Sequence, residues 1–481
     1  MDALIVSAAM PTIVAELGSM HLYSWVYSVY FLANAVALPI FGKLADLYRT
    51  RALFIVSIAL FIIASVLAGL APNMTFLIIA RVFQGIGAGG NFALVYIALS
   101  DVSTPEKRGK TLSLGSSVWG IASILGPMLG GFIVTYFSWR WIFFINVPLG
   151  LLSLAGIAVY LTETRAKKEK VYLDFPGVVL LSVLILSLLI VFLLGGRTYE
   201  WTSIPIVSLA VISVLAGGGF YFVEKRAAEP ILSLRFFEIK EFRIGNGAVF
   251  LSSFAIFALF AYAPLYIQGA LGRSPMMVGV GMLSLSLGWS LGALVLGQVL
   301  NILGHRASAL IGAASLVLGC AACLFFTTQT SMLTVFLVFF VVGIGMGVVT
   351  LTTLVVVQNS IDISNLGVAT TSHQFARTMG GTVGIGICGS FVISKIATAT
   401  EAMLHSGLAE NIPPAFLATI KTNIENLLLP EVQALLSDKV QTILQEAIVS
   451  GVAVVFWIVL AVSLLCLGFC WRLPGGKATR P

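Results

Sequence analysis

Long apolar segments separated by short polar connections follow one another along nearly the whole chain. A helix that crosses a bilayer needs about 20 apolar residues, and a window of that length selects fourteen segments in this sequence. They lie near 1–17, 25–47, 52–71, 76–100, 111–137, 142–162, 173–194, 203–222, 246–268, 275–302, 307–327, 331–357, 367–395 and 449–471. The pattern predicts an all-α integral membrane protein with fourteen transmembrane helices.

The first segment is shorter than the others, because only fifteen residues precede Glu16. It lacks the basic head and the small-residue cleavage site of a signal peptide. We therefore expect a first helix that is truncated, or one whose start is assigned too far downstream.

The composition agrees with a membrane protein and excludes a soluble one. Of the 481 residues, 59% are hydrophobic and 10% are charged, whereas soluble domains carry about a quarter charged residues. The net charge of +7 comes from short basic clusters between apolar segments, so it does not predict a nucleic-acid partner. The five cysteines all lie in apolar segments, which favours packed thiols over disulfides or metal ligands.

Lysine and arginine are distributed unevenly between the two sets of connections. One alternate set, with the C-terminal tail, holds nineteen of the 27 basic residues and the opposite set holds six, while Arg81 and Arg377 fall within predicted spans. The positive-inside rule then places both termini in the cytoplasm of a multi-pass protein of the cell membrane. The polar stretch 396–447 would face outward, as plain loop or with a short amphipathic helix in LLLPEVQALLSDKVQTILQ.

The two halves of the chain align with each other. GKLADLYRTR at Gly42 aligns with GQVLNILGHR at Gly297, and GIGAGG at Gly85 aligns with GIGMG at Gly343. At the second offset, two further glycine pairs match in the same order: Gly126 with Gly384 and Gly131 with Gly389. Such a series indicates an internal repeat.

The repeat predicts three regions. Residues 1–165 would form a first six-helix bundle, 166–243 an inserted pair of helices with cytoplasmic linkers, and 244–481 a second six-helix bundle. Parallel six-helix repeats around a central site are typical of secondary transporters, whose halves rock about that site.

Six motifs together resemble the major facilitator superfamily, and within it the fourteen-span drug:proton antiporters. They are MDALIVSAAMPTIVAELG, GKLADLYRTR, RVFQGIGAGG, GPMLGG, GGRTYEW and HQFARTMGGTVG, and they span essentially the whole chain. The resemblance implies the major facilitator fold and multidrug efflux. No catalytic triad, metal-ligand cluster or Walker loop is visible in the sequence, so we expect no enzyme, no cofactor and no metal. The expected partners are a small-molecule substrate, protons and the lipid bilayer, and we expect a monomer.

Glycine-rich runs suggest a nucleotide site only on a superficial reading. Gly85, Gly87 and Gly90 spell G-x-G-x-x-G, but they lie inside an apolar span and follow no strand of a βαβ unit. Close helix packing through small residues is the better interpretation.

Two further motifs are candidates for gating. In GPMLGG, Pro127 weakens a helix that Gly126, Gly130 and Gly131 allow to pack closely. This helix is either the hinge and seal between the halves or a static packing kink.

The resemblance implies a second gate after span two, at Gly42, Asp46 and Arg51. There a carboxylate pairs with an arginine, or with a helix N-terminus of the other half, while the cytoplasmic side is closed. The family pattern places Gly and Arg where this chain has Arg49 and Thr50. The tight turn is thus not secured, and a plain solvated loop is the alternative.

Ionisable residues within spans usually mark a pathway or a pair. Asp2 is the acidic residue inside a predicted span; it matches the first-span Asp of the family, and Arg81 matches the span-four Arg. Our hypothesis is that Asp2 takes and releases the coupling proton, with its charged form favoured when Arg81 or a cationic substrate approaches. A buried structural ion pair is the alternative, and the ammonium group of Met1 would neutralise Asp2 if the chain truly begins there.

Polar side chains within the spans are candidates for binding the substrate. They are Tyr30, Asn34, Gln84, Asn91 and Trp119 in the first half, and Gln358, Gln374 and Arg377 in the second. His373 shares a helix face with Arg377 but lies near the predicted cytoplasmic end of its span, which favours an interfacial histidine over a titrating one in the cavity.

The sequence therefore predicts export of an amphipathic or cationic organic compound in exchange for protons, by alternating access. A transporter of one defined solute, such as a basic amino acid or a single antibiotic, is the first alternative. A membrane receptor or scaffold that transports nothing is the second.

Overall fold

The structure is a computed structural model. It describes residues 5–6, 9, 13, 16–17, 22–103, 111, 118, 122, 125–126, 129–130, 132–134, 136–161, 174–195, 199–227, 234–273, 275–362, 366–405 and 438–474. These residues are helical apart from short connections and one isolated β-bridge between Gly195 and Tyr199.

The helices divide into the regions that the repeat predicts. The first region contains α2 (Tyr23–Leu47), α3 (Thr50–Gly69), α4 (Met74–Val102), α6 (Trp141–Phe144) and α7 (Asn146–Tyr160). The middle contains α8 (Phe175–Leu194), α9 (Ile204–Arg226) and the short η2 (Leu234–Glu238). The last contains α10 (Lys240–Leu265), the π-helical turn η3 (Tyr266–Ala270), α11 (Pro275–Leu303), α12 (His305–Cys323), α13 (Met332–Asn359), α14 (Leu366–His405) and α17 (Asp438–Trp471).

Many of these helices suit a bilayer. In the described part of the chain, nine helices are long and apolar enough to cross a membrane, and Val29–Ala45 and Pro176–Leu188 are shorter apolar helices. The chain is thus a multi-pass membrane protein, while the count of fourteen spans stays a prediction.

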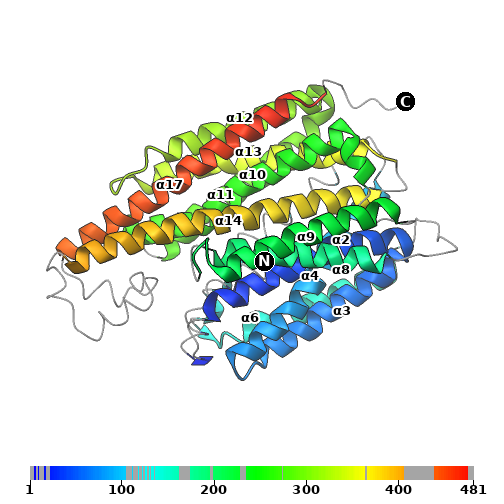
Figure 1. Cartoon of the computed structure of the whole chain (residues 1–481), viewed down its shortest axis with the longest axis horizontal. Helices are drawn as coiled ribbons and strands as arrows, with labels where there is room; N and C mark the ends of the chain where they lie inside the picture. Colours follow the sequence, from blue (N-terminus) through cyan, green and yellow to red (C-terminus); the bar gives the residue numbers. More distant parts are fainter. Residues whose placement is uncertain are drawn as a thin grey trace.

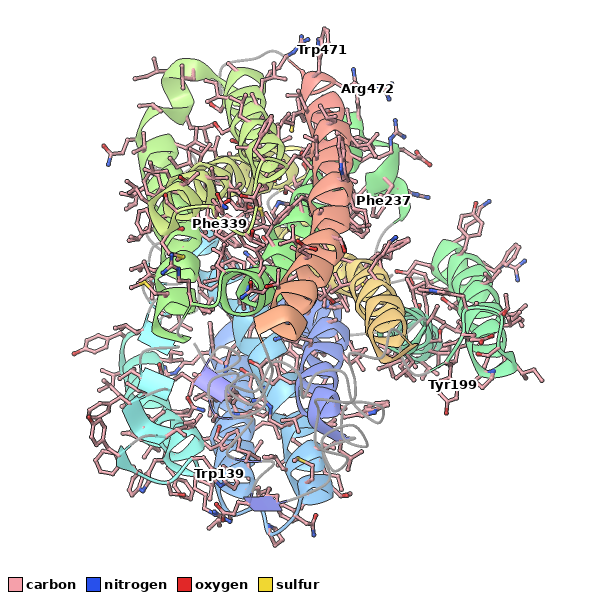
Figure 2. The ribbon with its side chains drawn as sticks, turned by 90° about the vertical axis from the view of Figure 1, so that its left-hand side faces the viewer. Trp139, Tyr199, Phe237, Phe339, Trp471 and Arg472 are labelled. Carbon is pink, nitrogen blue, oxygen red and sulfur yellow. The ribbon has the colours of Figure 1, made fainter. Side chains whose placement is uncertain are left out.

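The helices form two groups, with the middle pair at their side. In Figure 1 the blue helices α2, α3 and α4 lie together, and α10 to α13 lie with α17. Helix α14 contacts both α2 and α4, and α8 packs against α2 and α14. Figure 2 shows the pair α8 and α9 standing to one side of the two groups. The inserted pair is therefore attached beside the seam between the halves.

Glycines set the crossing of the second and fourth helices in each half. A Cβ atom added to Gly85 of α4 would lie 2.5 Å from the carbonyl oxygen of Tyr30 on α2. In the second half, a Cβ on Gly343 of α13 would lie 2.2 Å from the carbonyl oxygen of Leu285 on α11. The glycines are 258 positions apart and their partners 255, so the aligned segments pack in the same way.

The third helix of each half repeats this correspondence. A Cβ on Gly87 would lie 2.7 Å from the backbone nitrogen of Phe61 on α3, and one on Gly345 would lie 2.5 Å from that of Leu316 on α12. Close helix packing by GIGAGG and GIGMG is confirmed, because only a residue without a Cβ allows these backbones to approach so closely.

Substitution of one such glycine is expected to destabilise the second half. A Cβ on Gly347 would lie 2.2 Å from the carbonyl oxygen of Trp289, and the backbone cannot move aside as a flexible side chain would. We expect Gly347→Ala to cost about 1–3 kcal/mol, measured as a lower thermal midpoint of the purified protein in detergent. Gly468→Ala is the matched control, since its Cβ meets nothing within 4 Å. Equal midpoints for the two variants would contradict this account.

The turn that the sequence left in doubt does form. Only Tyr48 and Arg49 separate α2 from α3, with φ of −119° and −62°, so no glycine is required. In the second half a single residue, Gly304, separates α11 from α12, and its φ of +77° is one that glycine adopts without strain.

The last two long helices extend past their predicted spans. Helix α14 has 40 residues and α17 has 34, and a 40-residue helix is about 60 Å long, twice the hydrocarbon thickness of about 30 Å. Residues 396–405 and 438–447 are therefore helical, which shortens the predicted loop at both ends. The part of the predicted amphipathic helix that is described, from Asp438 onward, belongs to α17; its earlier part lies outside the described residues.

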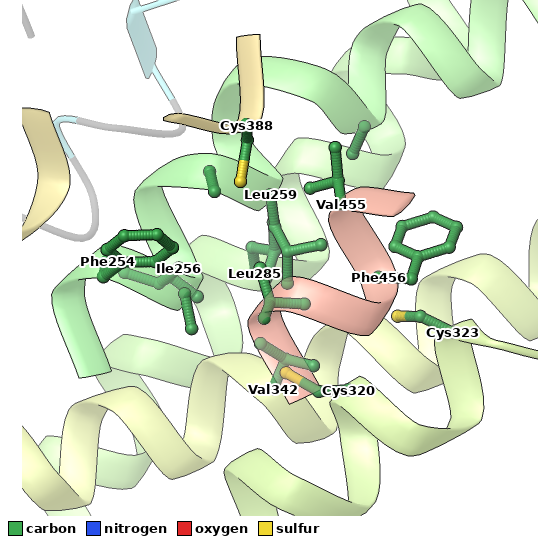
Figure 3. Close-up of a cluster of buried hydrophobic side chains, with 14 of the residues drawn as sticks. Phe254, Ile256, Leu259, Leu285, Cys320, Cys323, Val342, Cys388, Val455 and Phe456 are labelled. Carbon is green, nitrogen blue, oxygen red and sulfur yellow. The ribbon is translucent and has the colours of Figure 1, made fainter. Parts of the chain in front are cut away.

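Apolar side chains of four helices form the core of the second half. Figure 3 shows Phe254, Leu259, Leu285 and Phe456 meeting there, with three of the cysteines among them. All five cysteines are free and buried, which confirms the prediction of packed thiols.

Candidate functional site

Several predicted site residues cannot be placed. Asp2, Trp119, Pro127 and Gly131 lie outside the described residues, and of Asp46 only the backbone is described, in the last turn of α2. Their roles in proton coupling, gating and substrate binding stay predictions.

The remaining gating candidates lie in helical backbone. Gly42 is buried within α2, and Gly126 and Gly130 are buried helical residues of the predicted fifth span. Arg51 is exposed and donates a hydrogen bond to the carbonyl oxygen of Ala158, close to the end of α7. An arginine at that position favours the negative end of the helix dipole, so this contact stabilises the first half.

Arg81 is the centre of a buried polar network in the first half. Its side chain is 0% exposed, and its guanidinium carbon lies 4.0 Å from the centre of the Tyr30 ring. It donates to Oε1 of Gln84 at 2.7 Å and to the backbone carbonyl of Val26 at 3.3 Å. A buried cation is stable only with such partners, so the predicted residues Tyr30, Arg81 and Gln84 do form one site.

The network continues to two helices that the sequence did not indicate. Nε2 of Gln84 donates to Oγ of Ser65 on α3 at 2.8 Å, and Nδ2 of Asn146 on α7 reaches the same oxygen at 3.4 Å. The Ser65 hydroxyl in turn donates to the carbonyl of Phe61 at 2.7 Å. Serine and asparagine within apolar helices are a weak sequence signal, because either is also common in static packing.

The two asparagine candidates of the first half are separate from this network. Oδ1 of Asn91 accepts a hydrogen bond from Oγ of Ser57 on α3 at 2.7 Å. Asn34 is half-buried on α2, where its backbone carbonyl oxygen would lie 2.6 Å from a Cβ added to Gly89. These contacts tie α4 to its neighbours within one half.

A second polar row connects α13 with α14. Nε2 of Gln358 donates to Oγ1 of Thr370 at 2.8 Å, and Nε2 of His373 lies 2.9 Å from Oγ1 of Thr353. His373 is 0% exposed, so the interpretation as an interfacial histidine is wrong. The sequence position suggested a helix end, but the rotation of α14 turns this ring into the protein, towards α13.

Arg377 contacts both halves. Its guanidinium carbon lies 4.8 Å from the ring centre of Phe92 on α4 and 5.5 Å from that of Trp289 on α11. Its side chain also hydrogen-bonds Tyr96 on α4. These cation–π contacts join the second half to the first. The three aromatic residues were not predicted, since an aromatic side chain in an apolar helix is usually core or lipid-facing.

An apolar cluster closes the halves against each other beside Arg377. It takes Tyr96 from α4, Ala293, Leu296 and Leu300 from α11, and Val348, Leu351, Leu354 and Val355 from α13. These residues lie toward the ends at which the three helices finish, at Val102, Leu303 and Asn359. We call them the closing cluster. Its burial holds the halves together at this end of the molecule.

A polar clamp lies near the opposite end of the first half. Nε1 of Trp139 donates to Glu16 at 2.6 Å, and Arg140 forms an ion pair with the same carboxylate. The guanidinium carbon of Arg140 lies 4.4 Å from the Trp139 ring centre. The clamp ties the segment before α2 to α6.

No group of three or more metal-ligating side chains that could hold an ion occurs among the described residues. The ionisable groups available for chemistry within the helices are therefore those of the networks above, in the part of the chain that the structure describes.

The comparison with known proteins adds the family. The model of the Major Facilitator Superfamily matches residues 1–385. Multidrug transporter protein MdtP of Bacillus subtilis (strain 168) is 32% identical over 395 residues, 82% of this chain and 73% of that protein. Multidrug resistance protein 3 of the same strain is 33% identical over 422 residues, 86% of this chain and 82% of that protein.

Two further matches are more distant. Efflux pump dotC of Dothistroma septosporum is 30% identical over 442 residues, 89% of this chain and 74% of that protein. The crystal structure of the human organic anion transporter MFSD10 (TETRAN) superposes with a TM-score of 0.62 at 14% identity, and the match covers 98% of this chain and 96% of that one. At that identity the likeness concerns the fold alone.

Proposed function

The chain belongs to the Major Facilitator Superfamily, and from that premise we propose that it exports amphipathic or cationic organic compounds in exchange for protons. The observation that carries the proposal is the burial of Arg81 in a polar network of the first half. A positive charge at that depth is expensive in hydrocarbon and usually belongs to a transport pathway. The relatives named as multidrug transporters support the kind of cargo.

In this proposal the two halves open alternately on the two sides of the membrane. The closing cluster and the stacking of Arg377 on Phe92 hold one end shut. Asp2 carries the coupling proton and responds to the charge of Arg81. Release of the proton and binding of the cargo then bias the halves between the two closed arrangements. Gly126, Pro127, Gly130 and Gly131 act as the hinge, and Gly42, Asp46 and Arg51 as a gate.

The distribution of basic residues supports the orientation that we propose. Nineteen lysines and arginines on one set of connections and six on the other place both termini in the cytoplasm of a cell-membrane protein. The closing cluster would then seal the cytoplasmic side, because α4, α11 and α13 all finish there. We propose that the monomer is the transporting unit.

Asp2→Asn is expected to abolish pH-driven efflux, because an amide cannot take up and release the coupling proton. The protein is reconstituted in vesicles, and both proton flux and the flux of a lipophilic cationic dye are recorded under an imposed pH gradient. A chain extended at its N-terminus is compared, since the ammonium group of Met1 lies next to Asp2 in the sequence. Unchanged fluxes in Asp2→Asn would refute the role of this carboxylate.

The same vesicles test the wider proposal. Mutual competition among several unrelated amphipathic compounds supports multidrug efflux. Movement of one compound alone would replace it with a transporter of a single solute, and no proton or solute flux under any pH gradient would replace it with a membrane protein that does not transport.

A further inference from the structure

Gln374 is a buried amide without a partner. Its side chain is 0% exposed, and neither Nε2 nor Oε1 has a hydrogen-bond partner in the structure. A buried amide that makes no hydrogen bond costs about 1–3 kcal/mol. Such a group in a folded protein calls for an explanation, and one explanation is a ligand that supplies the missing bonds.

The position of Gln374 on its helix points it toward the meeting place of the two halves. Thr370, Gln374, Arg377 and Gly381 recur every three or four residues and therefore share one face of α14. Thr370 on this face contacts α13 through Gln358, and Arg377 contacts α4 and α11. A Cβ on Gly381 would lie 2.7 Å from the Phe257 ring of α10. Gln374 is thus on a face surrounded by helices of both halves.

Arg377 adds a fixed positive charge one helical turn away from this amide. The rings of Phe92 and Trp289 contact the guanidinium at 4.8 and 5.5 Å from their centres. Stacking on rings engages the flat faces of a guanidinium, whereas its five N–H donors point outward in its plane. Gln374 contributes two further N–H donors. Donors of both residues therefore occur together on one face, beside aromatic rings.

We propose that Gln374 and Arg377 bind an acidic group of the exported compound, so that this transporter carries amphiphiles with a carboxylate, a sulfonate or a phosphate ester. Two oxygens of such a group accept hydrogen bonds from the amide and the guanidinium together. The aromatic rings of Phe92, Tyr96 and Trp289 contact the apolar part of the same compound. The inference rests on the proposed export function and narrows its cargo.

A pair of dyes that differ only in this group tests the inference. The first is a rhodamine with a free benzoic acid, and the second is its methyl ester, which is cationic and has no acidic group. Efflux of each dye is measured with the full-length protein in vesicles under the same pH gradient. We expect wild-type protein to export the acid at least as well as the ester.

Gln374→Glu is the decisive variant, because it replaces the amide by a carboxylate of the same shape. Repulsion between like charges and the loss of two donors are expected to lower efflux of the acid at least about tenfold. Efflux of the ester is expected to stay within about twofold, which also shows that the variant is folded. Gln374→Leu, which removes the donors and adds no charge, should give an intermediate loss for the acid alone.

Asn246→Asp is the matched control. Asn246 is a buried amide of α10 in the same half, and its Nδ2 donates to the backbone carbonyl of Phe242 at 2.9 Å. A carboxylate introduced there should leave the ratio of acid to ester efflux unchanged.

The outcomes separate this inference from the proposed function. Export of the ester without export of the acid, or an equal fall for both dyes in Gln374→Glu, overturns the acidic-group site and leaves the export function standing. If wild-type protein moves neither dye nor any lipophilic cation under a pH gradient, the export function itself fails.

Discussion

Replacing Arg81 with leucine is expected to abolish pH-driven efflux while the protein still folds. The change removes the hydrogen bonds to Gln84 and to the carbonyl of Val26 and the contact with the Tyr30 ring. Hydrogen bonds of a charged donor are worth about 1.5–3 kcal/mol each, so two of them correspond to about a hundredfold or more in rate. Leucine fills much of the same volume without a charge, so the apolar packing around it is largely kept.

The measurement compares the initial rate of dye efflux in vesicles at matched protein content. Arg81→Lys is the control, because it retains the charge but loses the planar donor group that bonds Gln84 while it stacks on Tyr30. We expect Arg81→Lys to keep a measurable fraction of the rate and Arg81→Leu to keep none. Full activity of Arg81→Leu would show that the network is a structural feature unrelated to coupling.

Leu354→Lys is expected to hold the halves apart at the closing cluster and to eliminate uphill efflux. Leu354 is 2% exposed and lies among side chains of α4, α11 and α13. An ammonium group without a partner in such a cluster costs several kcal/mol. A bias of about 5.5 kcal/mol moves a two-state equilibrium from 1:99 to 99:1, so a single buried charge is sufficient to favour the open arrangement.

Chemical labelling reports this change directly. Ala293 is buried in the closing cluster, and the five native cysteines are buried as well, so Ala293→Cys introduces one defined site. We expect a water-soluble maleimide to react with this site slowly in the parent protein, and about tenfold faster or more in the Leu354→Lys background, in line with the shift in population. Leu333→Lys, on the exposed first turn of the same helix, should change neither labelling nor efflux. Equal labelling in both backgrounds would mean that the cluster does not separate the halves from water.

The glycine repeats show how far a pattern in one chain reaches. GIGAGG and GIGMG predicted close helix packing and a duplicated half, and the contacts of Gly85 with Tyr30 and of Gly343 with Leu285 agree with both. Spacing was sufficient here because a helix brings every fourth residue to the same face, so small residues at that spacing mark a close crossing before any partner is known.

The candidate site was predicted unequally in the two halves. Arg81, Gln84 and Tyr30 do meet, because the first two are three residues apart on one helix and polarity is rare within a span. His373 was assigned to the wrong surroundings, since a position near the end of a helix does not indicate which neighbour covers it. The aromatic partners of Arg377 come from α4 and α11, and no local pattern connects residues so distant in the chain.

The sequence by itself determined the class of the protein, its membrane-spanning helices, its duplicated halves and the two cations within them. These properties follow from local composition and from helical periodicity, which operate over one or two turns. Only the tertiary structure decided that Arg81 is bonded within the first half, that Arg377 reaches across to the first half, and that Gln374 has no partner. Those facts depend on how helices from distant parts of the chain rotate and pack against one another, because side-chain partners are chosen by three-dimensional neighbours and not by position in the chain.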